Sequence, residues 1–380
     1  MRRRHLVLVL VIVAIAVLWR PLLRPLGGGA VLILDIYSSA LWDRNVAAYV
    51  TPPPRIEDGV EPVGVDRMRV TWWIPGWGAT HPTVMLVNGA TAKGNDDPET
   101  RRLAEALARA GYMVMLPEFP FIRDGVLERR ATAVLDAAFA RALMRPEAHG
   151  MRVGAFGFSV GGGMLLAAAS RSGSLATASY VGALGAYYDL YAYLASVLSL
   201  TQRHGKVSEM WDADAEVRVR LPVAAAQALA DAADRDFVIA ELNATQGRLT
   251  GDPPSRLGAE ASALWRALSA TDYDQALLRL HELPASLREV FDELSPKTSW
   301  SALRPAVFWV HDTGDRFEPV SEAETAAATP HAGPTRFQRT ALLSHAAALG
   351  SGAKEKGLDF WTAELIGLLF FATEALAAGS

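Results

Sequence analysis

Ser159 stands in the stretch of this chain whose residue types and spacing are most specific for chemistry. It is the middle residue of Gly157-Phe158-Ser159-Val160-Gly161, a G-x-S-x-G pentapeptide. The preceding residues, Met151–Phe156, are typical of a short buried strand, and those from Val160 onward favour a helix. A serine at such a turn needs small residues two positions before and after it, because neighbouring backbone passes close by. The pattern predicts a serine nucleophile that needs a nearby base to take its proton.

Strands and helices alternate around this turn, which predicts a parallel sheet that positions the serine. Apolar runs typical of strands occupy Arg67–Ile74, Thr83–Val87, Tyr112–Leu116, Met151–Phe156, Ala178–Leu184, Pro305–Val310 and Thr335–Leu342. Helical patterns occupy Pro98–Ala110, Leu127–Met144, Ser321–Ala328 and Leu358–Ala377. Strands that alternate with helices of this length indicate an α/β fold with a mostly parallel central sheet flanked by helices. Asp359, Glu364 and Glu374 make the last helix more typical of a packed core than of a membrane span.

The pattern changes between Asp189 and Trp300, where Ala, Leu and charged residues predominate. Helices are expected over Pro222–Ala233, Arg256–Leu268, Asp272–Leu280 and Pro284–Leu294, and no strand is expected. We interpret this segment as an all-helical cap insertion that lies over the strand ends, either as a lid or as additional scaffold.

Composition excludes several classes of function. The 380 residues carry a formal net charge of -4 without a basic block beyond the N-terminus, so no nucleic-acid surface is expected. The chain contains no cysteine, which excludes a cysteine nucleophile, disulfides and thiolate metal sites. Hydrophobic residues make up 51% of the chain, enough for a large core.

Four motifs together resemble the α/β-hydrolase family over about Arg67 to Ala377. Thr83–Ala90 looks like its strand and oxyanion turn, and Gly157–Gly161 like its nucleophile elbow. Val310–Val320 is similar to its H-G-x-x-D-x-x-x-P acid loop, and Leu343-Ser344-His345 looks like its histidine loop. The chain departs from the family where Asn88 replaces a common His and where Asp312 replaces Gly.

The resemblance implies a Ser-Asp-His triad in the family's chain order. Ser159 would be the nucleophile, His345 the base and Asp315 the carboxylate that orients the imidazole. The backbone N–H groups of Ala90 and Val160 would stabilise the oxyanion. No metal or organic cofactor is implied.

Alternatives to these assignments remain open in the sequence. Asp312 lies beside Asp315, and Asp189 follows an earlier strand where some family members carry their acid. His331 precedes the last strand instead of following it, and His311 resembles a family histidine with a structural role.

Pocket residues are also expected near the turn. Asn88, Phe158, Tyr187 and Tyr188 are candidates to contact substrate, although the tyrosines also suit packing between cap and sheet.

The N-terminus indicates membrane targeting. Arg2-Arg3-Arg4-His5 precedes an apolar run from Leu6 to Trp19, and Gly27-Gly28-Gly29 is expected to separate it from the rest. We expect an uncleaved signal anchor with the catalytic domain outside the cytoplasm. The alternative is a cleaved signal and a secreted protein.

These features divide the chain into five segments. We expect the anchor at 1–26, a linker or packing segment at 27–66, the two core halves at 67–188 and 301–380, and the cap at 189–300. The expected function is hydrolysis of a carboxylic ester, or a thioester or amide, on a small-molecule acyl substrate. The alternatives are an acyl-transfer or perhydrolase-type enzyme on the same triad, and a degenerate domain that binds at a membrane. The sequence does not give the oligomeric state or the substrate.

Overall fold

The core of the molecule is an eight-stranded sheet in the order β1-β2-β4-β3-β5-β6-β9-β10. A computed structural model of the chain describes residues 24–42, 46–343, 345 and 356–379. The strands are β1 (Arg55–Val63), β2 (Asp66–Ile74), β3 (Thr83–Val87), β4 (Met113–Pro117), β5 (Val153–Phe158), β6 (Tyr180–Leu184), β9 (Ala306–Asp312) and β10 (Thr335–Thr340). Neighbours from β4 to β10 run parallel, and β1 and β2 are antiparallel at one edge. The expected mostly parallel sheet is confirmed.

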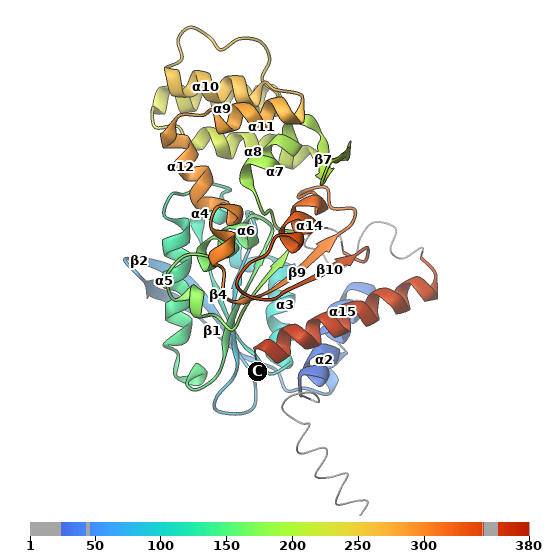
Figure 1. Cartoon of the computed structure of the whole chain (residues 1–380). Helices are drawn as coiled ribbons and strands as arrows, with labels where there is room; N and C mark the ends of the chain where they lie inside the picture. The colour runs from blue at the N-terminus through green and yellow to red at the C-terminus, as the bar shows by residue number, and fades with distance from the viewer. Residues whose placement is uncertain (1–23, 43–45, 344, 346–355, 380) are drawn as a thin grey trace, which may run out of the picture.

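Helices cover both faces of this sheet (Figure 1). The core helices are α2 (Arg24–Trp42), α3 (Pro98–Arg109), α4 (Pro120–Arg123), α5 (Ala131–Leu143), α6 (Ser159–Ala169), α13 (Pro296–Ser299), α14 (Val320–Ala328) and α15 (Leu358–Ala378). Helices α5 and α6 pack on one face, and α2, α3 and α15 on the other. Short 3₁₀ turns occupy Ala47–Tyr49, Gly94–Asp96, Pro146–Ala148, Leu175–Thr177 and Trp300–Ala302.

Strand β3 shows how the sheet divides two cores. Its five residues are all buried, as expected for a strand covered on both faces. Met85 and Val87 belong to the cluster under α5 and α6, whereas Val84 and Leu86 belong to the cluster under α3. Side chains alternate along a strand, so an uninterrupted apolar run fills both cores.

The segment expected as a linker is more ordered than its sequence suggests. Strand β1 pairs antiparallel with β2 along its whole length, and most of its side chains are exposed. An edge strand with an exposed face has no continuous apolar run, which explains why the sequence does not reveal it.

The expected break at the three glycines is wrong, because Gly27, Gly28 and Gly29 lie inside α2. A side chain at Gly28 would approach Leu376, and one at Gly29 would approach the backbone of Thr373 at 3.2 Å. These glycines let α2 pack closely on α15. The apolar run from Leu6 to Trp19 lies outside the described residues.

The insertion forms a helical layer above the sheet (Figure 1). Its helices are α7 (Leu190–Ser199), α8 (Ala215–Gln227), α9 (Ala232–Ala244), α10 (Ala259–Leu268), α11 (Tyr273–His281) and α12 (Ala285–Leu294). The expectation that it lacks strands is wrong, since β7 (Thr201–His204) and β8 (Val207–Met210) form an antiparallel hairpin. Gly205 adopts a φ of 63° in the turn, and β8 is exposed, so neither strand carries a buried apolar pattern.

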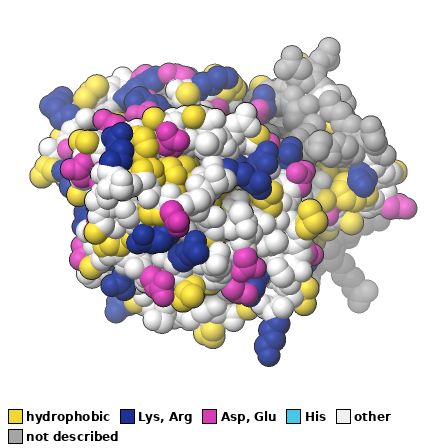
Figure 2. Space-filling model, turned by 90° about the horizontal axis from the view of Figure 1, so that it is seen from above, with side chains coloured by type: hydrophobic (Ala, Val, Ile, Leu, Met, Phe, Trp, Pro, Cys, Tyr) yellow, Lys and Arg dark blue, Asp and Glu magenta, His cyan; other side chains and the backbone are white. Residues whose placement is uncertain are grey.

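The outer surface of the insertion carries charges of both signs. Seen from above, Lys and Arg side chains are interspersed with Asp and Glu, without a large area of one sign (Figure 2). This agrees with the small formal net charge of -4.

Candidate active site

Ser159 lies at the turn between β5 and α6, where its backbone adopts a φ of 52°. A positive φ is unfavourable for any residue except glycine, and it places the hydroxyl at the tip of the turn. Ser159 lines a cavity of about 480 Å³ that also contains Ala90, Val160 and His345. The turn therefore exposes the predicted nucleophile to a space large enough for a small substrate.

The small residues around Ser159 are required by close backbone contacts. A Cβ at Gly157 would lie 2.7 Å from the Cα of Gly162. A Cβ at Gly161 would overlap the carbonyl oxygen of Asn88, and one at Gly89 would lie 3.2 Å from the Cβ of Ser159. The loop after β3 thus packs directly against the serine turn.

The side chain of Asn88 shapes the loop after β3 from within. Its Nδ2 donates to the carbonyl oxygen of Gly94 at 2.7 Å, and its Oδ1 accepts from Thr100 Oγ1 at 2.8 Å and from the Gly89 N–H at 2.9 Å. These three bonds fold the loop so that Gly89 and Ala90 face Ser159. A histidine would not reproduce this set, because its neutral ring offers one donor and one acceptor.

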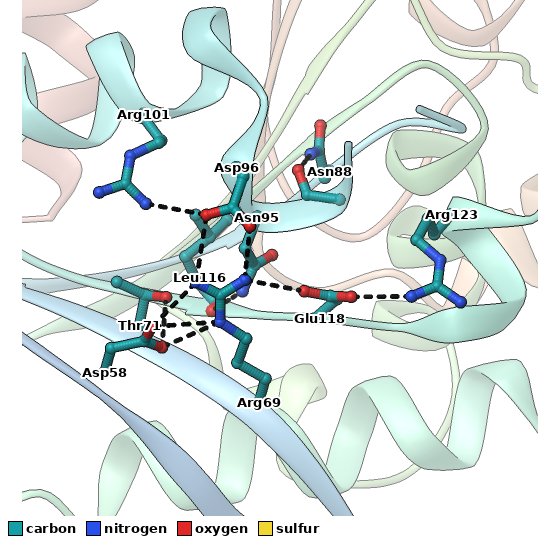
Figure 3. Close-up of polar contacts among 11 residues, drawn as sticks. Asp58, Arg69, Thr71, Asn88, Asn95, Asp96, Arg101, Leu116, Glu118 and Arg123 are labelled. Carbon is teal, nitrogen blue, oxygen red and sulfur yellow. Dashed lines mark hydrogen bonds and ion pairs between the residues drawn. The ribbon is translucent and has the colours of Figure 1, made fainter. Parts of the chain in front are cut away.

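A charged network fixes the same loop to the sheet (Figure 3). Arg69 on β2 lies at its centre, 2.8 Å from Asp58, 2.7 Å from Asp96 and 3.6 Å from Glu118. Asn95, beside Asp96, donates to a backbone carbonyl of β4. The acidic residues of this loop are therefore engaged in positioning it.

The acid and histidine loops meet at the same cavity. His345 Nδ1 lies 2.8 Å from Asp315 Oδ2, and the His345 ring stacks on Phe317 with 4.8 Å between centroids. Asp315 follows β9, and its Oδ1 accepts from the backbone N–H groups of Phe317 and Glu318. Asp315 is buried and holds His345 by one ring nitrogen, as a triad carboxylate does.

A second carboxylate, that of Glu318, contacts both Ser159 and His345. Glu318 Oε1 accepts the hydroxyl proton of Ser159 at 2.7 Å, and its Oε2 lies 3.2 Å from His345 Nδ1. Its side chain is only 1% exposed. Among the hydrogen bonds of the described residues, Ser159 Oγ donates to Glu318 and has no bond to His345.

The two carboxylates control the ionisation of His345. Burial alone would lower the pKa of His345, but the charges of Asp315 and Glu318 outweigh it and raise the pKa to about 9. Burial raises the pKa of Glu318 to about 7, assisted by the nearby charge of Asp315. Burial opposes ionisation of Asp315 too, but the imidazolium of His345 holds the pKa of Asp315 below its ordinary value.

The competing acids have other partners. Asp189 caps the start of α7 and pairs with Lys297 at 2.7 Å. Asp312 accepts the N–H of Gly314 through its side chain. Neither side chain has a hydrogen bond to the His345 ring among the described contacts, so the geometry favours Asp315.

The competing histidines are also engaged elsewhere. His331 hydrogen-bonds to the carbonyl oxygen of Leu303 and to Thr335. His311 is fully buried, and its Nε2 donates to the carbonyl oxygen of Glu318 at 3.0 Å. Its burial lowers its pKa, so His311 stays neutral and supports the acid loop.

Two of the four expected pocket residues line the cavity and two do not. Asn88 and Phe158 lie in the cavity wall, but Tyr187 and Tyr188 do not. Both tyrosines are buried, and Tyr187 donates to the carbonyl oxygen of Leu294 at the end of α12. Tyr193, one turn into α7, lines the cavity instead.

The arrangement of strands, turn and loops decides the fold. The serine follows the central strand β5, the acid follows β9 and the histidine follows β10, all at the carboxyl edge of one parallel sheet. The chain has the α/β-hydrolase fold.

Comparisons with known proteins found similarity at low sequence identity. No family model and no curated protein matches the sequence. Among solved structures, a dienelactone hydrolase from Anabaena variabilis has 14% identity and a TM-score of 0.43, with 85% of this chain and 96% of that chain covered. An acylaminoacyl peptidase from Pyrococcus horikoshii has 11% identity and a TM-score of 0.49, with 88% of this chain but 43% of that chain covered.

A brefeldin A esterase, described as a bacterial homologue of human hormone-sensitive lipase, has 15% identity and a TM-score of 0.46, with 92% of this chain and 85% of that chain covered. Likeness at this level does not transfer an activity or a site residue.

Glu318 is the site residue that sequence reasoning missed. Within the α/β-hydrolase pattern it occupies an unspecified position between Asp315 and Pro319. The available signal was an acidic residue three positions after the candidate acid and directly before Pro319, the N-cap of α14.

Proposed function

We propose that the chain is a serine hydrolase that cleaves a carboxylic ester through an acyl-enzyme on Ser159. The observation that carries this proposal is the cavity that the strained Ser159 and His345 both line, with His345 held by the buried Asp315. A thioester or an amide would react by the same steps.

The proposed chemistry needs donors for the negative charge on the substrate oxygen. Val160 follows the nucleophile at the start of α6, and Ala90 lies in the loop that packs against Ser159. Their backbone N–H groups are the proposed oxyanion donors. His345, oriented by Asp315, gives a proton to the leaving group and takes one from the water that hydrolyses the acyl-enzyme.

The cavity wall favours an apolar acyl group. Side chains from the core and from cap helix α8 form most of it, including Phe121, Ile122, Leu127, Met164, Val217 and Leu221. Burial of a hydrocarbon chain against such a wall contributes about 0.8 kcal/mol per methylene group. We therefore propose a small-molecule ester with a medium-sized hydrophobic acyl chain.

The proposed location is a membrane surface, reached through the N-terminal apolar segment. Among the described residues, one helix, α15, is long and apolar enough to cross a bilayer by length and composition. The apolar character of α15 supports attachment to a membrane in general, and the N-terminal anchor stays a proposal.

The experiment is labelling of the purified protein with a fluorophosphonate probe. Labelling of the wild type that is lost in Ser159→Ala is the expected result. Absence of labelling in the folded wild type would contradict the hydrolase and favour a binding domain. Labelling without ester hydrolysis, but with transfer to an added alcohol or peroxide, would instead support an acyl-transfer or perhydrolase enzyme.

A further inference from the structure

The side chain of Glu318 is placed where the reaction begins. It lies 2.7 Å from the nucleophilic oxygen of Ser159, and among the described residues no lysine or arginine forms an ion pair with it. A buried carboxylate that shares one imidazole with a second buried carboxylate is costly, because a single positive charge must offset two negative charges. Such an arrangement is typical of functional sites, where pKa values are set for proton transfer.

We propose that Glu318 is a catalytic residue that takes the hydroxyl proton of Ser159 when Ser159 attacks the acyl carbon. The proposal rests on the proposed serine hydrolase function. It assigns the first proton transfer to Glu318 and leaves the remaining transfers to His345. The reason is geometric, because the Ser159 hydroxyl donates to Glu318 and the Nδ1 atom of His345 faces the carboxylates.

The steps balance without any other reactant. Attack forms the bond between Ser159 Oγ and the acyl carbon, moves the carbonyl π electrons to oxygen and transfers the hydroxyl proton to Glu318 Oε1. Collapse breaks the bond to the leaving oxygen, which keeps the electron pair and takes a proton from Nε2 of His345. Water then attacks the acyl carbon and gives a proton to the neutral His345. The released Ser159 oxygen takes its proton back from Glu318, so one ester and one water yield an acid and an alcohol.

The charges around Glu318 agree with these roles. The titratable groups that face Glu318 are His345 and Asp315 from the two loops, Tyr193 from α7 and Tyr187 from the segment before α7. Burial raises the pKa of both tyrosines, so both stay neutral. With pKa values of about 7 for Glu318 and about 9 for His345, the ionised acid and the protonated imidazole coexist between these values. That state is the one from which attack and leaving-group protonation both proceed.

The test compares phosphonylation rates by the fluorophosphonate probe. Its leaving group is fluoride, which departs without a proton, so the rate reports removal of the Ser159 proton. Glu318→Gln keeps the shape of the side chain and should lower the rate about 100-fold or more. Glu322→Gln is the matched control, because Glu322 is equally buried in α14 and binds the N–H groups of Tyr188 and Asp189 instead of Ser159.

The outcomes separate the two proposals. A labelled wild type and an unlabelled Ser159→Ala, with Glu318→Gln within about threefold of wild type, would overturn the role of Glu318 and keep the hydrolase. An unlabelled wild type would overturn the hydrolase itself.

Glu318→Asp provides a second variant should the glutamine variant not fold. It retains an ionisable carboxylate, so its labelling rate should still rise with pH as that carboxylate ionises. A Glu318→Asp rate with no such rise would contradict the proposal.

A different observation concerns the outer face of α2 and α15, which pack side by side (Figure 1). The exposed side chains of α2 include Leu26, Ala30 and Leu34, and those of α15 include Ala363, Ile366 and Phe370. Each set recurs every three or four residues, so each forms one stripe on its helix. Phe370 is 60% exposed and Ile366 48%.

Two of the three acidic side chains of α15, Glu364 and Glu374, contact strand β10, whereas Asp359 in its first turn is exposed. Glu364 accepts from Thr340 Oγ1 at 2.7 Å, and Glu374 pairs with Arg336 of β10. Only 17% of the most apolar window of α15 is buried. Between Ala363 and Phe370 the exposed side chains of α15 are thus apolar, whereas an ordinary surface helix exposes polar side chains there.

We infer that the α2–α15 face lies on a lipid bilayer. The apolar run from Leu6 to Trp19 ends five residues before α2 begins at Arg24, so an anchor there would hold this face at the membrane surface. Two apolar stripes next to an anchor suit shallow insertion below the lipid headgroups.

Because the chain contains no cysteine, a single introduced cysteine can be labelled at a chosen position. Phe370→Cys carries a fluorescent dye in full-length protein reconstituted into phosphatidylcholine and phosphatidylglycerol vesicles, and Met210→Cys in β8, which is 89% exposed, is the control. Lipids brominated on their acyl chains should quench the dye at 370 and leave the dye at 210 unchanged. Equal absence of quenching at both sites would overturn the inference, even if the protein remains on the vesicles through its N-terminus. Protection of the dye at 370 from aqueous iodide without lipid quenching would also overturn it, by showing a protein-covered face.

Discussion

Gly157→Ala tests whether the serine turn requires the close backbone approach that the structure shows. The added Cβ would lie 2.7 Å from the Cα of Gly162, about 1 Å inside an ordinary carbon–carbon contact of about 3.5–4.0 Å. Both atoms belong to rigid backbone, so the start of α6 must move away. Overpacking of this kind lowers the free energy of unfolding by about 1–3 kcal/mol. A shift of about 1 Å at Ser159 should lower the phosphonylation rate about 100-fold.

The assay pairs chemical denaturation with the rate of fluorophosphonate labelling. Gly59→Ala is the control, because a Cβ at Gly59 in edge strand β1 meets nothing within 4 Å. This variant should keep wild-type labelling and stability. If Gly157→Ala labels at the wild-type rate with unchanged stability, then β5 and α6 are not packed as described and the steric account of the G-x-S-x-G motif fails here.

Two further predictions concern the acid helix and the cavity. Burial raises the pKa of Glu322 to about 8 from its ordinary 4.5, so the folded state binds more protons than the unfolded state between these values and stability falls as pH rises. Glu322→Gln has no such proton to lose. The free energy of unfolding of Glu322→Gln minus that of the wild type, measured by urea titration, should therefore increase from pH 5 to pH 8. A difference that does not change with pH would refute this prediction. Ala224→Phe fills the cavity from α8 and should lower kcat/KM for long-chain esters at least about tenfold more than for acetyl esters in a chain-length series. An equal loss for all esters would show that the acyl chain does not lie against α8.

Sequence reasoning recovered the elements that carry strong local signals. Thr83–Val87 matches β3 because a fully buried strand is apolar without interruption. Asp97 begins α3 as a side-chain cap, which the acidic start of that helix indicates. The turn at Ser159 follows from glycines that leave no space for a side chain.

The features that sequence reasoning missed depend on contacts between distant segments. Gly27–Gly29 looks like a break until α15 is placed against it. Tyr187 and Tyr193 are only six positions apart, but Tyr193 lines the cavity and Tyr187 does not. Tyr187 is instead bonded to the end of α12, which is distant in the sequence. The carboxylate of Glu318 contacts Ser159, which is 159 positions away in the sequence, so nothing near Glu318 in the sequence indicates this contact.

The cap is bonded to the acid loop, which limits how it can act as a lid. Trp211 Nε1 donates to the carbonyl oxygen of Asp315 at 2.7 Å, and Tyr193 Oη donates to that of Phe317 at 2.7 Å. The backbone N–H of Asp214 donates to the carbonyl oxygen of Arg316 at 2.7 Å. Three consecutive residues of the acid loop are thus held by the first part of the insertion.

The two ends of the insertion are fixed at one buried cluster as well. Asp189, at its start, pairs with Lys297, at its end, and the backbone N–H of Asp189 donates to Glu322 at 2.7 Å. A rigid rotation of the whole cap would break these bonds and displace Asp315 from His345. Helix α8 also contacts the loop after β3 beside the cavity, because Arg220 donates to the carbonyl oxygen of Ala90 at 3.1 Å. The segment from Asp189 to Asp214 is consequently tied to the acid loop. Helix α12 is tied to the core by the ion pairs Arg171–Glu293 and Arg129–Glu289, so the cap cannot move as one body without breaking contacts to the core at both of its ends.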